Sequence, residues 1–185
     1  AISHYEEAWQ IAYNRRDTNS QIYAFNNIGT VYETIKEDID SALIFYEKAS
    51  FLADSYTHSS EYTKAALLHN VGTIYLQKED FPRSKRYLYK AQKIARDANL
   101  EVVKLTIKGS ISELYVQEGK YQDAVTSARQ GYQEALRRQA AYIIPTFLEA
   151  IHMGFEGQKR YDSAYHYLSL SSQYVDSTKK KKQDE

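Results

Sequence analysis

The sequence predicts an all-α protein, a right-handed α-α superhelical solenoid of helix hairpins. Small residues recur about every 40 positions at the same place on a helical face, and a short polar turn separates the two helices of each predicted pair. The 185 residues include only two prolines and seven glycines, which are too few turn residues for a many-stranded β protein. Hydrophobic residues make up 43% of the chain, enough for a continuous buried core.

The second helix of each pair carries small residues on one face. These helices open at Ala1, Ala42, Ser84, Ala124 and Ala164, with spacings of 41, 42, 40 and 40 residues. Further members of each column follow after steps of four, three and four residues, as at Tyr46, Ala49 and Ala53. Such steps keep one face of an α-helix in register, so they predict a buried stripe.

The first helix of each pair has its own columns. Phe25-Ile28-Gly29-Tyr32 is echoed by Leu68-Val71-Gly72-Tyr75, Lys108-Ile111-Ser112-Tyr115 and Leu148-Ile151-His152-Phe155. Polar turns such as Lys36-Glu37-Asp38 follow each of these segments. The predicted solenoid covers residues 1–178, with a half unit at 1–18 and full units at about 19–58, 59–99, 100–139 and 140–178; a charged tail follows at 179–185.

These columns resemble the tetratricopeptide repeat (TPR). That family places a small residue, usually glycine, before a tyrosine on the first helix, and an alanine-aromatic-alanine pattern on the second. The repeat here is longer than the family's usual period of about 34 residues, and is similar to the repeat arrays of bacterial signalling regulators. The resemblance implies that Gly29 and Gly72 lie where two helices touch.

Four positions depart from the pattern, the first being Lys108, which lies in an apolar column. Ser112 and His152 replace the small glycine, so the last two hairpins are expected to pack less closely. Pro145 lies near the start of a predicted first helix, which either begins around Ile143 or kinks at the proline.

Both ends of the chain are expected to be cut from a longer protein or to take part in assembly. Residues 1–15 form a second helix without a first helix before it. The last helix, over 161–174, has two apolar stripes. Tyr161, Ala164, Tyr165, Leu168 and Val175 form the stripe expected to face the preceding repeat. Tyr167, Leu170 and Tyr174 form the other, which predicts an interface covered by a partner, a second copy or following residues.

Composition and motifs predict no catalytic site. The five histidines have no metal-ligand spacing, and neither a phosphate-binding loop nor a nucleophile motif occurs, so no metal and no cofactor is expected. Lys plus Arg equals Asp plus Glu at 24 each, which argues against a nucleic-acid partner. No apolar run is long enough to insert into a membrane.

The remaining candidate site is the concave groove that the first helices line in this architecture. Its predicted residues are Tyr23, Asn26, Asn27, Thr30, Glu33, His69, Asn70, Thr73, Gln77, Glu113 and Met153. Amide and hydroxyl groups at regular rise suit hydrogen bonds to an extended peptide. The alternative is that these positions are solvated helix faces. The family often uses asparagine at the places of Asn27 and Asn70, either to hold a ligand backbone or to satisfy an inter-helix turn.

The function predicted from these features is non-catalytic binding of a protein or peptide. The resemblance favours the sensor or input part of a larger bacterial regulatory protein. The alternative is a structural scaffold that assembles a complex or a homodimer through its end faces. The groove carries glutamates and no lysine or arginine at the predicted positions, which favours a neutral or basic segment over a peptide carboxylate. The compartment stays open between periplasm and cytoplasm, and the resemblance alone favours the periplasm.

Overall fold

The computed structural model describes the backbone of residues 2–183 and the side chains of residues 2–176. Within that part of the chain the structure is all α, with no strand. The chain forms two compact units, Ala1–Val103 and Lys104–Glu185. The predicted all-α fold class is confirmed. The side chains of the predicted charged tail, 179–185, lie outside the described residues.

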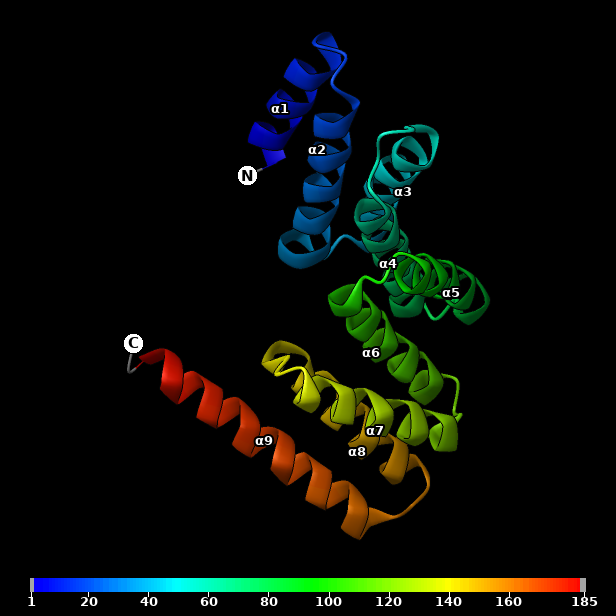
Figure 1. Ribbon diagram of the computed structural model, residues 1–185, viewed down its shortest axis with the longest axis vertical. Helices are drawn as coiled ribbons and strands as arrows, with labels where there is room; N and C mark the ends of the chain where they lie inside the picture. Colours follow the sequence, from blue (N-terminus) through cyan, green and yellow to red (C-terminus); the bar gives the residue numbers. More distant parts are fainter. Residues whose placement is uncertain (1, 184–185) are drawn as a thin grey trace. The chain divides into compact units, whose positions relative to one another are not determined.

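The helices of each unit follow one another as antiparallel neighbours joined by short turns (Figure 1). The first unit holds α1 (Ile2–Asn14), α2 (Thr18–Val31), the π-helical turn η1 (Tyr32–Lys36), α3 (Ile39–Ser55), α4 (Glu61–Gln77) and α5 (Phe81–Asp97). Helix α6 (Glu101–Gln117) begins at the end of that unit and lies mainly in the second. The second unit continues with α7 (Tyr121–Arg137), the 3-10 turn η2 (Ala141–Ile143), α8 (Ile144–Gly157) and α9 (Tyr161–Gln183).

Local capping chemistry begins and ends these helices. The Asp38 carboxylate accepts a hydrogen bond from the backbone N–H of Ser41 at 3.0 Å, and the Asp80 carboxylate accepts one from the N–H of Arg83 at 3.1 Å. Each bond satisfies a backbone N–H in the first turn of α3 or α5 that has no partner within its helix. At the other end, a residue with positive φ closes every turn except the one between α3 and α4, and Glu79 at 57° is an example. The next backbone N–H then bonds a carbonyl near the helix end, as Asp80 N does to Tyr75 O at 2.9 Å.

Close approach at glycine joins the two helices of a hairpin in the first unit. Gly29 and Gly72 are both buried. A Cβ on Gly29 would lie 2.8 Å from two ring carbons of Tyr46, and a Cβ on Gly72 would lie 2.9 Å from Leu88 Cγ. A side chain at either position would force the facing residue, Tyr46 or Leu88, to move. The expectation that two helices touch at these glycines is confirmed.

The two hairpins of the second unit replace that glycine with polar residues that bond across the pair. Ser112 Oγ lies 2.9 Å from Ser127 Oγ on α7. His152 Nδ1 lies 3.0 Å from the carbonyl oxygen of Ala164 on α9. Because a carbonyl only accepts, Nδ1 carries the proton and donates it. The two departures from glycine thus form hydrogen bonds between the paired helices.

Helix α8 begins at Ile144, with Pro145 in its first turn. The missing N–H of proline removes no hydrogen bond there, because the first N–H groups of a helix have no intrahelical acceptor. Of the two alternatives for Pro145, the helix start is therefore confirmed and the kink is absent. Pro82 lies in the first turn of α5 in the same way.

The turn η1 absorbs one inserted residue. Thirteen positions separate Gly29 from Ala42, whereas twelve separate Gly72 from Ser84. The wider π-helical turn takes up the additional residue, and the backbone N–H of Asp38 still bonds Tyr32 O at 3.0 Å. The capping aspartate and the start of α3 therefore keep the arrangement of the next hairpin.

Enlarging Gly72 should destabilise the fold in proportion to side-chain size. We expect Gly72→Ala to lower the free energy of unfolding by about 1 kcal/mol and Gly72→Leu by about 3 kcal/mol or more, because a Cβ there would meet the Leu88 side chain and lie 3.2 Å from the backbone nitrogen of Leu88 on α5. Urea denaturation monitored by circular dichroism measures both values. The matched control is Lys93→Leu, an exposed change on α5, expected to stay within about 0.5 kcal/mol of the parent. Equal stability of Gly72→Leu and Lys93→Leu would contradict the close approach.

Candidate functional site

Polar side chains link the first helices of the two hairpins in the first unit. Asn70 Nδ2 donates to Asn26 Oδ1 at 3.0 Å, and Gln77 Nε2 donates to Glu33 Oε1 at 2.8 Å. Thr30 and Thr73 lie between these two bonds along their helices, and their hydroxyls bond the backbone carbonyls of Asn26 and Asn70. We call these six residues the polar ladder: Asn26, Thr30, Glu33, Asn70, Thr73 and Gln77. The structure thus brings six of the eleven predicted groove residues together.

Glu33 ties the polar ladder to the core of its hairpin. It lies in the η1 turn, and its Oε2 accepts the hydroxyl of Tyr46 at 2.7 Å while Oε1 accepts Gln77. Burial raises the pKa of the Tyr46 hydroxyl, the hydrogen bond to Thr30 lowers it, and the charge of Glu33 raises it further. Tyr46 therefore stays protonated and remains a donor to Glu33. The same ring fills the space opposite Gly29.

His69 is half-buried beside the polar ladder. Burial lowers the pKa of its imidazole below the ordinary value of 6.5, against the opposing effects of the Asn70 hydrogen bond and the Glu33 carboxylate. The neutral form is therefore favoured near pH 7. The histidine is held by its neighbours and is not a solvated side chain.

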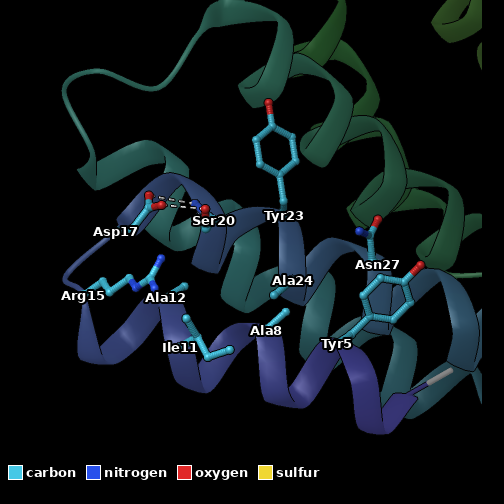
Figure 2. A pocket seen from close by; sticks show the side chains of 10 residues that line it. All are labelled: Tyr5, Ala8, Ile11, Ala12, Arg15, Asp17, Ser20, Tyr23, Ala24 and Asn27. Carbon is cyan, nitrogen blue, oxygen red and sulfur yellow. Dashed lines mark hydrogen bonds between the residues drawn. The ribbon is translucent and has the colours of Figure 1, made fainter.

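Tyr23 and Asn27 line a pocket of about 390 Å³ between α1 and α2. Figure 2 shows Ala8 and Ala24 facing each other across it, with Tyr5 and Asn27 near one end and Arg15 at the other. Asp17 lies at the Arg15 end, but its carboxylate already caps α2 through Ser20. Of the predicted groove residues, Tyr23 and Asn27 line this pocket. The opposite wall includes Tyr5, Ala8 and Ala12 on α1, which repeat the spacing of Tyr46, Ala49 and Ala53, and that repeated spacing was the signal for it in the sequence.

Glu113 and Met153, the two predicted groove residues in the second unit, line one pocket of about 270 Å³ between α6 and α8. Val116 and Ala150 form an apolar part of its wall, and Glu149 places a second carboxylate there. Burial raises the pKa of the Glu113 carboxyl, and a hydrogen bond from Gln117 lowers it. This pocket is acidic and partly apolar.

Solved structures of similar shape place this arrangement in a known fold. Nearly identical TPR-like repeats of a kinesin light chain from Podosopora anserina match at 14% identity, with a TM-score of 0.71, over 96% of this chain and 86% of that one. The fold is that of TPR-like repeat proteins. No protein-family model and no curated protein sequence matches the chain.

Two further TPR-like matches are longer proteins. Aspartyl phosphate phosphatase F from Bacillus subtilis matches at 13% identity, with a TM-score of 0.80, over 96% of this chain and 46% of that one. The Rap conjugation gene regulator of the plasmid pLS20, solved in complex with the Phr* peptide, matches at 20% identity, with a TM-score of 0.77, over 86% of this chain and 44% of that one. The chain therefore spans less than half the length of these two proteins.

A membrane-crossing helix, which would have to be long and apolar, is not found among the described residues.

The prediction that Tyr167, Leu170 and Tyr174 lie on the outward face of α9 is wrong. Tyr167, Leu170 and Tyr174 are half-buried and pack against the core of their own unit. Tyr167 stacks on Phe155 of α8 with ring centroids 5.7 Å apart, and its hydroxyl accepts from Arg129 Nη2 at 3.3 Å. Helix α9 carries two apolar stripes at helical spacing. The stripe that was expected to face outward is the one that packs against α7 and α8.

The exposed stripe of this helix consists of Tyr161, Tyr165 and Leu168, and Tyr165 is 74% exposed. Only Ala164 of the expected inward stripe is fully buried, while Val175 is half-buried.

A repeated aromatic position explains why the Tyr167 stripe faces inward. Three residues after the small residue that opens each second helix (Ala42, Ser84 or Ala164) lies an aromatic residue: Phe45 on α3, Tyr87 on α5 and Tyr167 on α9. Phe45 stacks on Tyr32 and Tyr87 stacks on Tyr75, each with centroids 5.5 Å apart, as Tyr167 stacks on Phe155. Ser127 occupies this position on α7 and bonds Ser112. The repeated spacing was visible in the sequence and would have placed Tyr167 inward.

Tyr167 should therefore contribute to stability. We expect Tyr167→Ala to lower the free energy of unfolding by about 2 kcal/mol, because the ring loses its stack on Phe155 and its contact with Arg129. The matched control is Tyr165→Ala, which removes an exposed ring from the same helix and should cost less than about 0.5 kcal/mol. Thermal and urea unfolding compare the two variants. A larger loss for Tyr165→Ala would show that the inward face is misassigned.

The lowered pKa of His69 makes stability depend on pH. The unfolded chain binds the imidazole proton more readily than the folded one, so the contribution is complete above about pH 6.5 and is lost as pH falls through the folded pKa. We expect the parent to lose more stability between about pH 7.5 and pH 5 than His69→Gln does. Urea denaturation at both pH values measures the difference. The exposed-site control, His4→Gln, should keep the parent's pH dependence.

Proposed function

We propose that the chain is a non-catalytic repeat module that binds a protein segment or peptide along its first helices, as the input part of a larger bacterial regulatory protein. The observation that carries the proposal is the polar ladder between α2 and α4. It presents amide and hydroxyl groups from two neighbouring helices on one face, with Thr30 and Gln77 exposed. An extended peptide needs such groups, because its own N–H and C=O groups have no partners within the segment.

Part of the ladder's hydrogen-bonding capacity is left for a ligand. Asn26 accepts through Oδ1, and its amide nitrogen has no acceptor among the described residues. The Asn70–Asn26 and Gln77–Glu33 hydrogen bonds already hold these side chains in place, so binding of a peptide would not have to order them. Preorganisation of this kind lowers the entropic cost of binding.

The charge of the same helix faces supports a neutral or basic segment. Glu113 and Glu149 share the pocket of the second unit with Val116, Ala150 and Met153. A lysine or arginine side chain could place its aliphatic part on these apolar groups and its charge near the carboxylates. Glu33 contributes less, because both of its oxygens already accept hydrogen bonds.

The structural matches support the regulatory part of the proposal. A Rap regulator was solved with the Phr* peptide, and another Rap protein with competence and sporulation factor; the latter matches at 18% identity with a TM-score of 0.58. Since this chain covers less than half of the Phr*-bound regulator, the proposal assigns it the recognition step alone.

A structural scaffold is the second candidate, and one observation favours it. Tyr161, Tyr165 and Leu168 form an exposed apolar ridge on α9. On a scaffold, such a ridge would be the contact surface, and the polar ladder would have no ligand.

Selection from a displayed library of random twelve-residue peptides tests the proposal. Recovered peptides are then titrated by fluorescence anisotropy against the parent, Asn26→Ala and Asn70→Ala. We expect each ladder variant to weaken binding by about tenfold or more, since truncation leaves the opposing amide without its partner. The control Asn14→Ala removes an amide from exposed α1 and should bind like the parent. Thermal unfolding of every variant separates loss of binding from loss of fold.

Two outcomes would overturn the peptide site. One is a library that yields no peptide binding the folded parent. The other is a set of peptides that both ladder variants bind unchanged. If such peptides lost binding to Tyr165→Glu instead, the scaffold would be the better function.

A further inference from the structure

The residues that line the pocket between α1 and α2 correspond, by repeat position, to the residues of α3 and α4 against which α2 packs. By repeat position, Tyr5, Ala8 and Ala12 on α1 correspond to Tyr46, Ala49 and Ala53 on α3. The pocket residues of α2 correspond in the same way to α4. Ser20, Tyr23, Ala24 and Asn27 match Thr63, Ala66, Leu67 and Asn70, at a constant offset of 43.

Helix α2 fills the space between the walls formed by α3 and α4. Ile22 of α2 lies in one buried cluster with Ala49, Ala53 and Leu67. Gly29 of α2 lies against the Tyr46 ring, which is only 2% exposed. The corresponding walls on α1 and α2 are covered only in part. Ala12 and Ala24 are already buried, whereas Ala8 is exposed and Tyr23 is 51% exposed. A pocket of about 390 Å³ lies between the two helices on this side.

We propose that this pocket is a docking groove for one amphipathic α-helix of a partner segment, seated as α2 is seated against α3 and α4. The observed seat of α2 defines its chemistry. A glycine or alanine would lie against Tyr5, as Gly29 lies against Tyr46. An apolar side chain would cover the exposed Ala8 beside the buried Ala12 and Ala24, as Ile22 packs against their counterparts.

Two polar groups in the groove specify further features of the helix. Asn70 donates to Asn26 of the helix seated against it, whereas its counterpart Asn27 forms no hydrogen bond within the described residues. An asparagine or aspartate three positions before the small residue would supply the missing acceptor. The side chain of Arg15 forms no ion pair or hydrogen bond in the same part of the chain, although its charge helps to lower the pKa of the nearby Asp17 carboxyl. It lies at the pocket end formed by the start of α2. An acidic side chain in the first turn would pair with it and also suit the helix dipole.

The walls favour a helix over an extended peptide. Ala8, Ile11, Ala12 and Ala24 offer no hydrogen-bonding side chain to an extended backbone, which would leave its N–H and C=O groups unpaired as it became buried. A helix satisfies these groups internally and needs only side-chain packing. The helices of a second copy that carry this pattern, α2 and α4, are already packed in their own hairpins, which favours a separate partner segment as the occupant.

The direct test uses a fluorescent peptide with the sequence of residues 17–36, which carries the α2 pattern, and the full 185-residue chain. We expect saturable binding by fluorescence anisotropy. The same peptide with Gly29→Leu should bind about tenfold more weakly, because the larger side chain meets Tyr5. In the chain, Ala8→Arg should weaken binding by a similar factor, and the control Gln10→Arg should not. Ala8 is exposed in the free chain, so its substitution leaves folding intact.

A fusion keeps the proposal testable if the free peptide is too weakly helical. A second copy of residues 17–41 placed directly before Ala1 puts its small residue at the spacing found between Gly29 and Ala42, and raises the effective concentration. We expect this fusion to unfold about 5 °C above the same fusion carrying Gly29→Leu in the added copy.

Equal melting temperatures of the two fusions, or peptide binding that Ala8→Arg leaves unchanged, would overturn the proposal. Self-association of the parent that Ala8→Arg abolishes would also overturn it, in favour of a second copy as occupant. The Asn70→Ala variant distinguishes this groove from the proposed peptide site, because helix docking between α1 and α2 should be unaffected by it.

Discussion

The close approach of the two helices in a hairpin is the constraint on which the other features depend. At Gly29 and Gly72 the second helix comes so near that a Cβ would contact the facing side chain below 3.0 Å. This spacing lets the Tyr46 ring lie across the first helix and reach Thr30 and Glu33 with its hydroxyl. The polar ladder therefore starts from a packing interaction. Helix packing positions Glu33, and Glu33 in turn orients Gln77 on the next first helix.

Where the chain departs from glycine, hydrogen bonds across the pair appear in its place. Ser112 bonds Ser127, and His152 donates to a backbone carbonyl of α9. The π-helical turn serves a related purpose, because it absorbs one residue without shifting the aspartate that caps α3. The inserted residue also widens the backbone at Glu33, whose carboxylate joins two hairpins. The repeat thus keeps its capping and pairing while individual positions change, since each turn and each contact is satisfied locally.

The candidate site was predicted in part. Residue types and the repeat period were enough to place Asn26, Thr30, Glu33, Asn70, Thr73 and Gln77 on one face, and the structure joins them in one network. The pocket between α1 and α2 was missed, although two of its residues had been named. A small-residue stripe signals burial against a helix, and the sequence does not show which helix covers it. The structure shows α3 packed between α2 and α4, whereas α1 packs against α2 alone. The comparison between the two identifies the groove and the kind of segment that fits it.

The sequence by itself determined the fold class, the turns and the close approach at glycine, because these follow from spacing along one helix and from local chemistry. Columns at steps of four, three and four can only be a helical face, and an aspartate before a helix caps it wherever it lies. The burial of α9 was decided only by tertiary structure. Its two stripes, one with Tyr165 and one with Tyr167, both satisfy helical spacing, so the sequence offers two equal solutions. Stacking of Tyr167 on Phe155, a contact between helices, selected one of them. A periodic pattern specifies a helix, whereas the face that is buried depends on what the neighbouring helix presents to it.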